Sequence, residues 1–219
     1  MPKKNNQREN HCPVPKGILV VIGGAENKGG ENDEKNLPGE IKLEVLENFM
    51  RLMKALKPHV EVITTGGVKD PDGSFMEYQK VFNDLGAGVV NHIHHVNRKD
   101  VDEDGLAKRL ETCDGIFVAG GDQLRITSIY GGTHFLTQLK QRYIHDPIVV
   151  GGTSAGAMAL STPMIYAGVG SDQMISGKVS VTTGLEFIAD RCITVKKQLV
   201  FAGIGGSLML FGISVEAKA

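Results

Sequence analysis

Short apolar runs alternate with amphipathic segments along the chain from residue 17 onward. The apolar runs end at glycine or polar residues, which is typical of buried strands. They lie at residues 17–22, 60–65, 88–96, 116–119 and 147–150. Between them, apolar positions recur at helical spacing at residues 38–56, 74–86, 101–112, 123–130 and 133–144. This alternation predicts one α/β domain, a three-layer α/β/α sandwich with a mainly parallel sheet covered on both faces.

Two of the expected helices carry specific start signals. Pro38 precedes an apolar face that runs from Ile41 to Leu56, and proline is typical of a first helical turn. Ser74 and Glu77 have the spacing of a capping box. We therefore expect the first helix to begin at Pro38, and the second to begin at the capping box and stop near Gly86.

Composition excludes several partner classes. The chain has 219 residues, with 24 basic against 25 acidic side chains and a net charge of −1. Such a balance gives no strong field that would favour nucleic acid or an anionic membrane. The three cysteines show neither zinc spacing nor a disulfide pattern, which indicates reduced thiols in a cytoplasmic protein.

The two ends of the chain differ from its middle. Residues 1–16 are polar and basic and lack the apolar run of a secretory signal, so we expect a disordered lead-in. Residues 199–215 are almost wholly apolar but contain four glycines. Seventeen residues are at the lower limit for crossing a bilayer, and a buried strand pair or a misfit tail is favoured over a membrane span.

Three glycine-rich turns follow strands, where open α/β sheets place their ligands. They lie at residues 23–24, 120–123 and 152–156, and the last reads G-T-S-A-G. This pattern at a strand-to-helix junction predicts Ser154 as an exposed nucleophile on a strained turn. The amide of Ala155 is expected to stabilise an oxyanion, with Gly120 or Gly121 as the second donor. An anion-binding turn with an incidental serine is the alternative.

The histidines are candidates for the general base. Three of them occur in NHIHH, where strand geometry places His92 and His94 on one face and His95 on the other. No acidic or cysteine ligand is spaced to complete a zinc site, so a structural role is favoured and no metal is expected. All seven histidines precede Ser154, including His134 and His145 on the expected helix before the last strand.

Four segments in this order resemble one known family. GILVVIGGAENKG, FVAGGDQLRI, VVGGTSAGAMALS and TGLEFI are similar to the corresponding parts of the cyanophycinases, over residues 16–189. The resemblance implies a class I glutamine amidotransferase-like sandwich and a serine exopeptidase related to bacterial aspartyl dipeptidases. It implies hydrolysis of cyanophycin, a polyaspartate carrying β-linked arginines, to β-Asp-Arg dipeptides through an acyl-enzyme and without a cofactor.

The resemblance also implies roles for individual residues. Ser154 would be the nucleophile, and Ala155 and Gly121 would form the oxyanion hole. Asp122 and Gln123 of the GGDQ segment would line the substrate pocket.

The similarity stops abruptly after residue 189. Where the family carries an Asp-x-His-Phe motif with its general base, followed by arginines, this chain reads TVKK at residues 194–197. We expect residues 190–219 to be an atypical tail that arises from truncation or a frame change. A serine without its base loses on the order of 10⁴ in rate. The alternatives are therefore a catalytically impaired or non-catalytic member of the family, and an aspartyl or isoaspartyl dipeptidase.

A sheet without the family's last strands would also leave an open edge and exposed apolar surface. We expect poor solubility or a homodimer formed through that edge.

Overall fold

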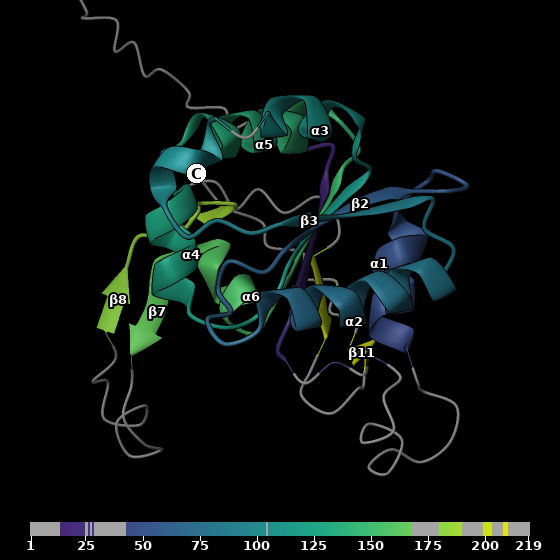
Figure 1. The fold of residues 1–219 in the computed structure, drawn as a ribbon, viewed down its shortest axis with the longest axis horizontal. Coiled ribbons are helices and arrows are strands. Elements are labelled where there is room, and N and C mark those ends of the chain that lie inside the picture. Colours follow the sequence, from purple (N-terminus) through teal and green to yellow (C-terminus); the bar gives the residue numbers. More distant parts are fainter. Residues whose placement is uncertain are drawn as a thin grey trace, which may run out of the picture.

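Seven strands form the central sheet of the protein, which was analysed as a computed structural model (Figure 1). The structure describes residues 14–24, 26, 28, 43–103, 105–167, 180–189, 199–202 and 208–209. The strands of this sheet are β1 (Ile18–Ile22), β2 (His59–Ile63), β3 (Val89–Ile93), β4 (Gly115–Val118), β5 (Val149–Thr153), β10 (Leu199–Ala202) and β11 (Leu208–Met209). Their order is β11-β10-β1-β5-β4-β2-β3, and every pair except β10 with β11 is parallel. All five strands expected from the sequence are present.

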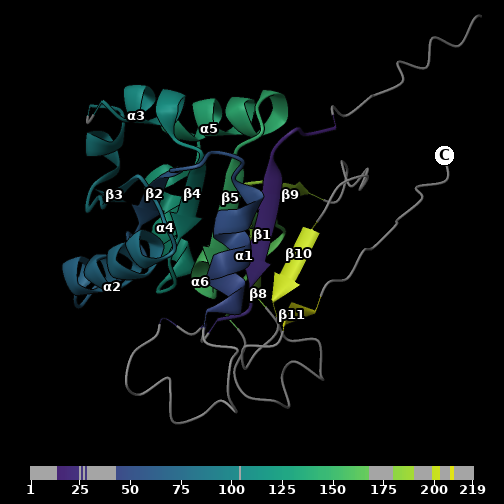
Figure 2. The ribbon, with the colours of Figure 1, turned by 90° about the vertical axis from the view of Figure 1, so that its right-hand side faces the viewer.

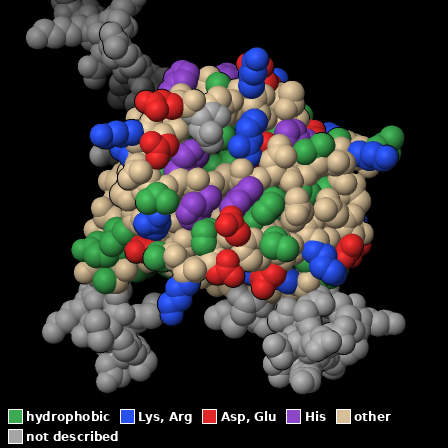
Figure 3. All heavy atoms as spheres, viewed as in Figure 1, with side chains coloured by type: hydrophobic (Ala, Val, Ile, Leu, Met, Phe, Trp, Pro, Cys, Tyr) green, Lys and Arg blue, Asp and Glu red, His purple; other side chains and the backbone are tan. Residues whose placement is uncertain are grey.

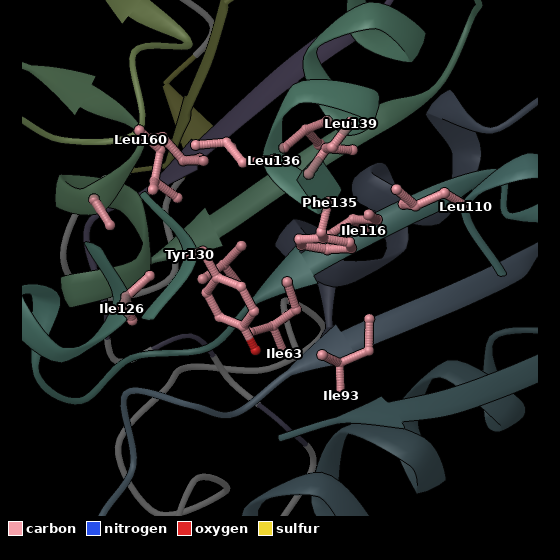
Figure 4. Close-up of a cluster of buried hydrophobic side chains, with 14 of the residues drawn as sticks. Ile63, Ile93, Leu110, Ile116, Ile126, Tyr130, Phe135, Leu136, Leu139 and Leu160 are labelled. Atoms are coloured by element: carbon pink, nitrogen blue, oxygen red, sulfur yellow. The ribbon is translucent and has the colours of Figure 1, made fainter. Parts of the chain in front are cut away.

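Helices cover both faces of this sheet (Figure 2). The helices are α1 (Glu44–Leu52), α2 (Pro71–Asp84), α3 (Leu106–Thr112), α4 (Gln123–Tyr130), α5 (His134–His145) and α6 (Ala155–Ala159), with a 3₁₀ turn η1 (Arg98–Val101). One buried cluster joins one face of the strands to α1 and α2. A second cluster joins the opposite face to α3, α4 and α5, and Figure 4 shows Ile63, Tyr130 and Leu136 meeting there. The two clusters make the three layers that the sequence predicted.

Three helix boundaries differ from the expectation. Helix α1 ends at Leu52, because the next residue, Met53, has extended backbone (φ −78°, ψ 123°), and Leu56 is fully exposed. Residues 38–42, where this helix was expected to begin, lie outside the described residues. Helix α2 starts one turn before the expected capping box, since the Asp70 carboxylate accepts a hydrogen bond from the Gly73 amide, 2.8 Å away.

The third difference lies before α3. The expected helix at 101–112 is divided into η1 and α3, and Gly105 stands between them in the left-handed conformation. A left-handed residue cannot continue a right-handed helix, so α3 begins only at Leu106.

Two strands extend the sheet beyond β1. In the register of β1 with β10, Leu19 lies opposite Leu199, and β11 then runs antiparallel to β10. Both strands come from residues 190–219, so this tail pairs where the sequence suggested an open edge. The strand pair expected within 199–215 is present in its described residues, whereas dimerisation stays a prediction. Across the ranges given above, no helix has the length and apolar character needed to cross a bilayer.

Two smaller sheets lie beside the helices at the carboxyl ends of the strands. One pairs β6 (Ser161–Thr162) with β9 (Ile188–Ala189), and the other is the antiparallel pair β7 (Met164–Ala167) and β8 (Ser180–Thr182). Figure 1 shows β7 and β8 next to α4 and α6. This pair therefore flanks the end of the sheet where α/β proteins hold their ligands.

Candidate active site

Ser154 occupies the junction between the end of β5 and the start of α6. Its backbone has φ 51° and ψ −117°, and it is one of two residues other than glycine with positive φ in the described chain. Such a conformation costs of order 1–3 kcal/mol and persists only where the surroundings hold it. The serine side chain is exposed, whereas Thr153 before it and Ala155 after it are buried. The chain therefore presents this one hydroxyl at the carboxyl edge of the sheet.

Glycines make room around the serine. A Cβ atom on Gly24 would lie 3.2 Å from the Ser154 Cβ, and one on Gly120 would lie 3.3 Å from it. Below the turn, a Cβ on Gly156 would lie 2.2 Å from the Val118 carbonyl oxygen. Since no side chain fits there, α6 packs directly against β4. The glycines of the G-x-S-x-G pattern thus have the steric role that the sequence predicted.

Two backbone amides near Ser154 have no acceptor among the described residues. The Ala155 amide is the first of α6 and has no intrahelical acceptor. Gly121 follows β4 with φ +134°, and the next amide, of Asp122, donates to the Gly66 carbonyl at 2.9 Å. Among the described residues, neither Ala155 nor Gly121 donates an amide hydrogen bond. Their role as oxyanion donors stays a prediction.

Asp122 and Gln123, which the sequence placed in the substrate pocket, stand at the start of α4. Asp122 Oδ1 accepts hydrogen bonds from the amides of Leu124 and Arg125, so this carboxylate caps the helix. The Gln123 amide nitrogen lies 3.3 Å from the Ile165 carbonyl oxygen and 3.5 Å from that of Tyr166. Both side chains are therefore already engaged, and Gln123 ties α4 to β7.

The histidines of NHIHH divide between the faces as expected. His92 and His94 both hydrogen-bond to the Thr64 hydroxyl, at 2.7 and 3.2 Å. His95 is buried on the other face, 3.1 Å from the Tyr130 hydroxyl. Burial lowers the pKa of His92, despite the opposing effect of the nearby Asp72 carboxylate. Histidine side chains are visible across this side of the molecule in Figure 3, but no group of three or more metal-ligating side chains occurs in the described chain.

No described side chain hydrogen-bonds to the Ser154 hydroxyl. The strand order puts the end of β3, with His92 and His94, three strand spacings or about 14 Å from β5. His145 ends α5 and precedes the amino end of β5, so the length of that strand, about 16 Å, separates it from Ser154. His134 begins α5, where its amide donates to the Asp102 carboxylate at 3.2 Å. Residues 194–197, where the family's base motif belongs, lie outside the described residues.

Sequence reasoning missed one group beside the serine. Glu26 is 9% exposed and accepts hydrogen bonds from the hydroxyls of Tyr78 and Thr153. These partners are 52 and 127 residues away along the chain, so no local pattern reveals them. The only local signal was an acidic residue in the glycine-rich turn after β1.

The family of the chain follows from comparison with known proteins. A model of peptidase family S51 matches residues 30–193. The chain belongs to peptidase family S51. A cyanophycinase of Synechococcus elongatus is 31% identical over 188 residues, which are 86% of this chain and 53% of that protein. A cyanophycinase of Trichormus variabilis is 29% identical over 175 residues, covering 80% of this chain and 55% of the relative. The chain therefore spans about half the length of the curated relatives it matches.

Solved structures show the same fold. A peptidase from an acI-B1 actinobacterium superposes with a TM-score of 0.52 at 17% identity, over 76% of this chain and 63% of that chain. A peptidase E-type protein from Listeria monocytogenes EGD-e gives a TM-score of 0.52 at 15% identity, over 81% of this chain and 76% of the other. At these identities the likeness concerns the fold alone. It confirms the expected α/β sandwich with a mainly parallel sheet, consistent with the glutamine amidotransferase-like class.

Proposed function

We propose that the protein is a serine-type exopeptidase that hydrolyses cyanophycin to β-Asp-Arg dipeptides, with Ser154 as its nucleophile. The observation that carries this proposal is the strained, exposed Ser154 at the start of α6, together with the amides of Ala155 and Gly121, which donate no hydrogen bond to any described residue. Strain of this kind is concentrated at functional sites. A turn that merely binds an anion would not need a hydroxyl held in that conformation, so the geometry favours a nucleophile over the anion-binding alternative.

In the proposed reaction, the Ser154 oxygen attacks the carbonyl carbon of the scissile bond, and its proton passes to a base. The carbonyl oxygen becomes an oxyanion, which the amides of Ala155 and Gly121 stabilise. Collapse of this intermediate expels the amine, whose nitrogen takes the proton from the base, and leaves an acyl-enzyme. Water then attacks the ester carbonyl and gives a proton to the base, which passes it to the serine oxygen as the acid leaves.

The substrate class rests on the relatives and on the GGDQ segment. Several curated relatives are named cyanophycinases. Asp122 and Gln123 stand directly after Gly121, at the edge of the sheet that also bears Ser154. We propose that they face the substrate, with the Gln123 amide exchanging its contact to β7 for one to the polymer.

Incubation of the purified full chain with cyanophycin tests this proposal. We expect β-Asp-Arg to be released and detected by chromatography with mass spectrometry, and release to disappear in Ser154→Ala. Dipeptides with an N-terminal aspartyl or isoaspartyl residue are assayed in parallel. Cleavage of these dipeptides without release from cyanophycin would instead assign the chain to the aspartyl dipeptidases.

A second candidate function, a non-catalytic member of the family, is favoured by one observation. No described side chain hydrogen-bonds to the Ser154 hydroxyl, so no base is in place among the described residues. If protein with native circular dichroism and cooperative melting releases no product, while still retaining cyanophycin in a sedimentation assay, this second function replaces the first.

A further inference from the structure

Glu26 is a buried carboxylate that the proposed reaction does not use. One of its oxygens accepts a hydrogen bond from the Tyr78 hydroxyl and the other from the Thr153 hydroxyl. Burial of a charge is costly unless hydrogen bonds compensate it, and here both oxygens have donors. An apolar residue could fill the same space, so the two hydrogen bonds fix the relative position of the segments in addition to filling space.

The three partners come from separate parts of the fold. Thr153 is the last residue of β5 and directly precedes Ser154. Tyr78 lies in the middle of α2 and is 2% exposed. Gly24, two residues before Glu26, packs against the Ser154 Cβ. One carboxylate therefore connects the turn after β1, helix α2 and the end of β5 around the serine.

Lys28, two residues after Glu26, also contacts helix α2. Its ammonium group lies 3.0 Å from the Glu77 carboxylate and 4.3 Å from the centre of the Tyr78 ring. Burial, and then the charge of Glu26, raises the pKa of Tyr78, so its hydroxyl keeps its proton and stays a donor. The hydroxyls of Tyr78 and Thr153 therefore both donate towards Glu26.

We propose that Glu26 is a positioning residue for Ser154, which locks the turn after β1 and the end of β5 so that the serine keeps its strained backbone. The inference rests on the proposed function, in which that strain presents the nucleophile. The Ser154 amide also donates to the Ile22 carbonyl at 2.9 Å, so the serine is attached to β1 just before the segment that Glu26 anchors. If Glu26 loses these hydrogen bonds, the backbone of Ser154 and its contact with Gly24 are no longer held in place.

The test compares Glu26→Gln with Glu61→Gln as a matched control. Glu61 is also a buried carboxylate, but it lies inside β2 and pairs with Arg109. Glutamine keeps the size of the side chain and removes its charge, so it cannot accept from both hydroxyls. Tyr78→Phe is the milder second variant, because it deletes a single hydrogen bond.

Two measurements report on each variant. The first is the rate at which a fluorophosphonate labels Ser154, followed by intact mass spectrometry, with Ser154→Ala as the blank. We expect Glu26→Gln to slow labelling by about 10- to 100-fold, since small misplacements at a reacting group cost that much. Tyr78→Phe should slow it less, and Glu61→Gln should leave it within about twofold of the parent protein.

The second measurement is amide hydrogen exchange in peptides covering residues 149–158, which needs no activity. We expect faster exchange there in Glu26→Gln, and unchanged exchange there in Glu61→Gln. Equal labelling rates and equal exchange in the two variants would overturn the inference, even if both variants melt at lower temperature. Absence of labelling in the parent protein counts against the proposed nucleophile, and exchange then decides the positioning role by itself.

Discussion

Replacement of Gly121 by alanine is the sharpest test of how the candidate oxyanion loop is held. Gly121 has φ +134°, and an added Cβ would lie 2.2 Å from both the carbonyl carbon and the oxygen of Gly66. These are backbone atoms that cannot rotate away. The loop is also held in place, because the Asp122 amide donates to the same Gly66 oxygen at 2.9 Å. Gly121→Ala must therefore either strain the loop or separate it from the end of β2.

The cost has two parts. A residue with a Cβ in this backbone region loses about 1–3 kcal/mol. The overlap with Gly66 forces a backbone shift, which costs about a further 1–3 kcal/mol. Gly86 provides a control, since it also has positive φ (+93°) but an added Cβ there meets nothing within 4 Å. Gly86→Ala should therefore show the first cost without the second.

Urea unfolding followed by circular dichroism measures both variants under one set of conditions. We expect Gly121→Ala to lose about 2–6 kcal/mol of unfolding free energy, and Gly86→Ala to lose about 1–3 kcal/mol. The difference between the two variants isolates the contact with Gly66. Equal losses in the two variants would refute the reasoning, because the close approach of the two loops would then contribute nothing.

Three further predictions follow from single contacts. Ser154→Gly should raise the unfolding free energy by about 1–3 kcal/mol in urea, because it removes the strain at φ 51°, whereas Ser154→Ala should not. Arg109→Met should lower it by about 3 kcal/mol, because the fully buried Glu61 loses its main cation, whereas the exposed Lys108→Met should change it little. Burial lowers the pKa of His92 below its ordinary 6.5, so the unfolded chain takes up this proton first. Stability should therefore fall as the pH drops through 6.5 towards the lower folded pKa, and urea midpoints at pH 7.5 and 5.5 should differ less in His92→Gln.

The central strands were predictable because they are buried on both faces, β4 and β5 at every position. A short apolar run that ends at two glycines, such as Val149–Val150, predicts a buried strand because it is too short for a helix. Helix ends were less predictable, since several residues compete for each cap. Asp70 and Ser74 are both good N-cap residues, and Pro71 at the first helical position favours the earlier one. The order of the strands depends on pairings between distant segments, which no local pattern specifies.

The candidate site also contains residues that local sequence patterns predict and residues that they do not. Ser154 and its glycines were predictable because the elbow is a local pattern with a steric cause. Glu26 was not, since its meaning depends on two hydroxyls from other elements. The contact of Gln123 with the carbonyls of β7 also joins distant segments, so no local pattern indicated it, and the expected role of Gln123 in the substrate pocket stays a prediction.

The contacts that expose Ser154 are therefore distinct from the base that would activate its hydroxyl. The serine is presented by β1, α2, β4 and β5, through the contacts of Gly24, Glu26 and Gly120. None of these contacts supplies a base to the hydroxyl. Formation of a fluorophosphonate adduct passes the serine proton to a base and expels fluoride, but it needs neither a protonated leaving amine nor attack by water, so labelling can occur without turnover of a peptide. Labelling without release of β-Asp-Arg would thus mark an activated serine that does not turn over the polymer, whereas folded protein that shows neither labelling nor release would have retained the elbow without a base.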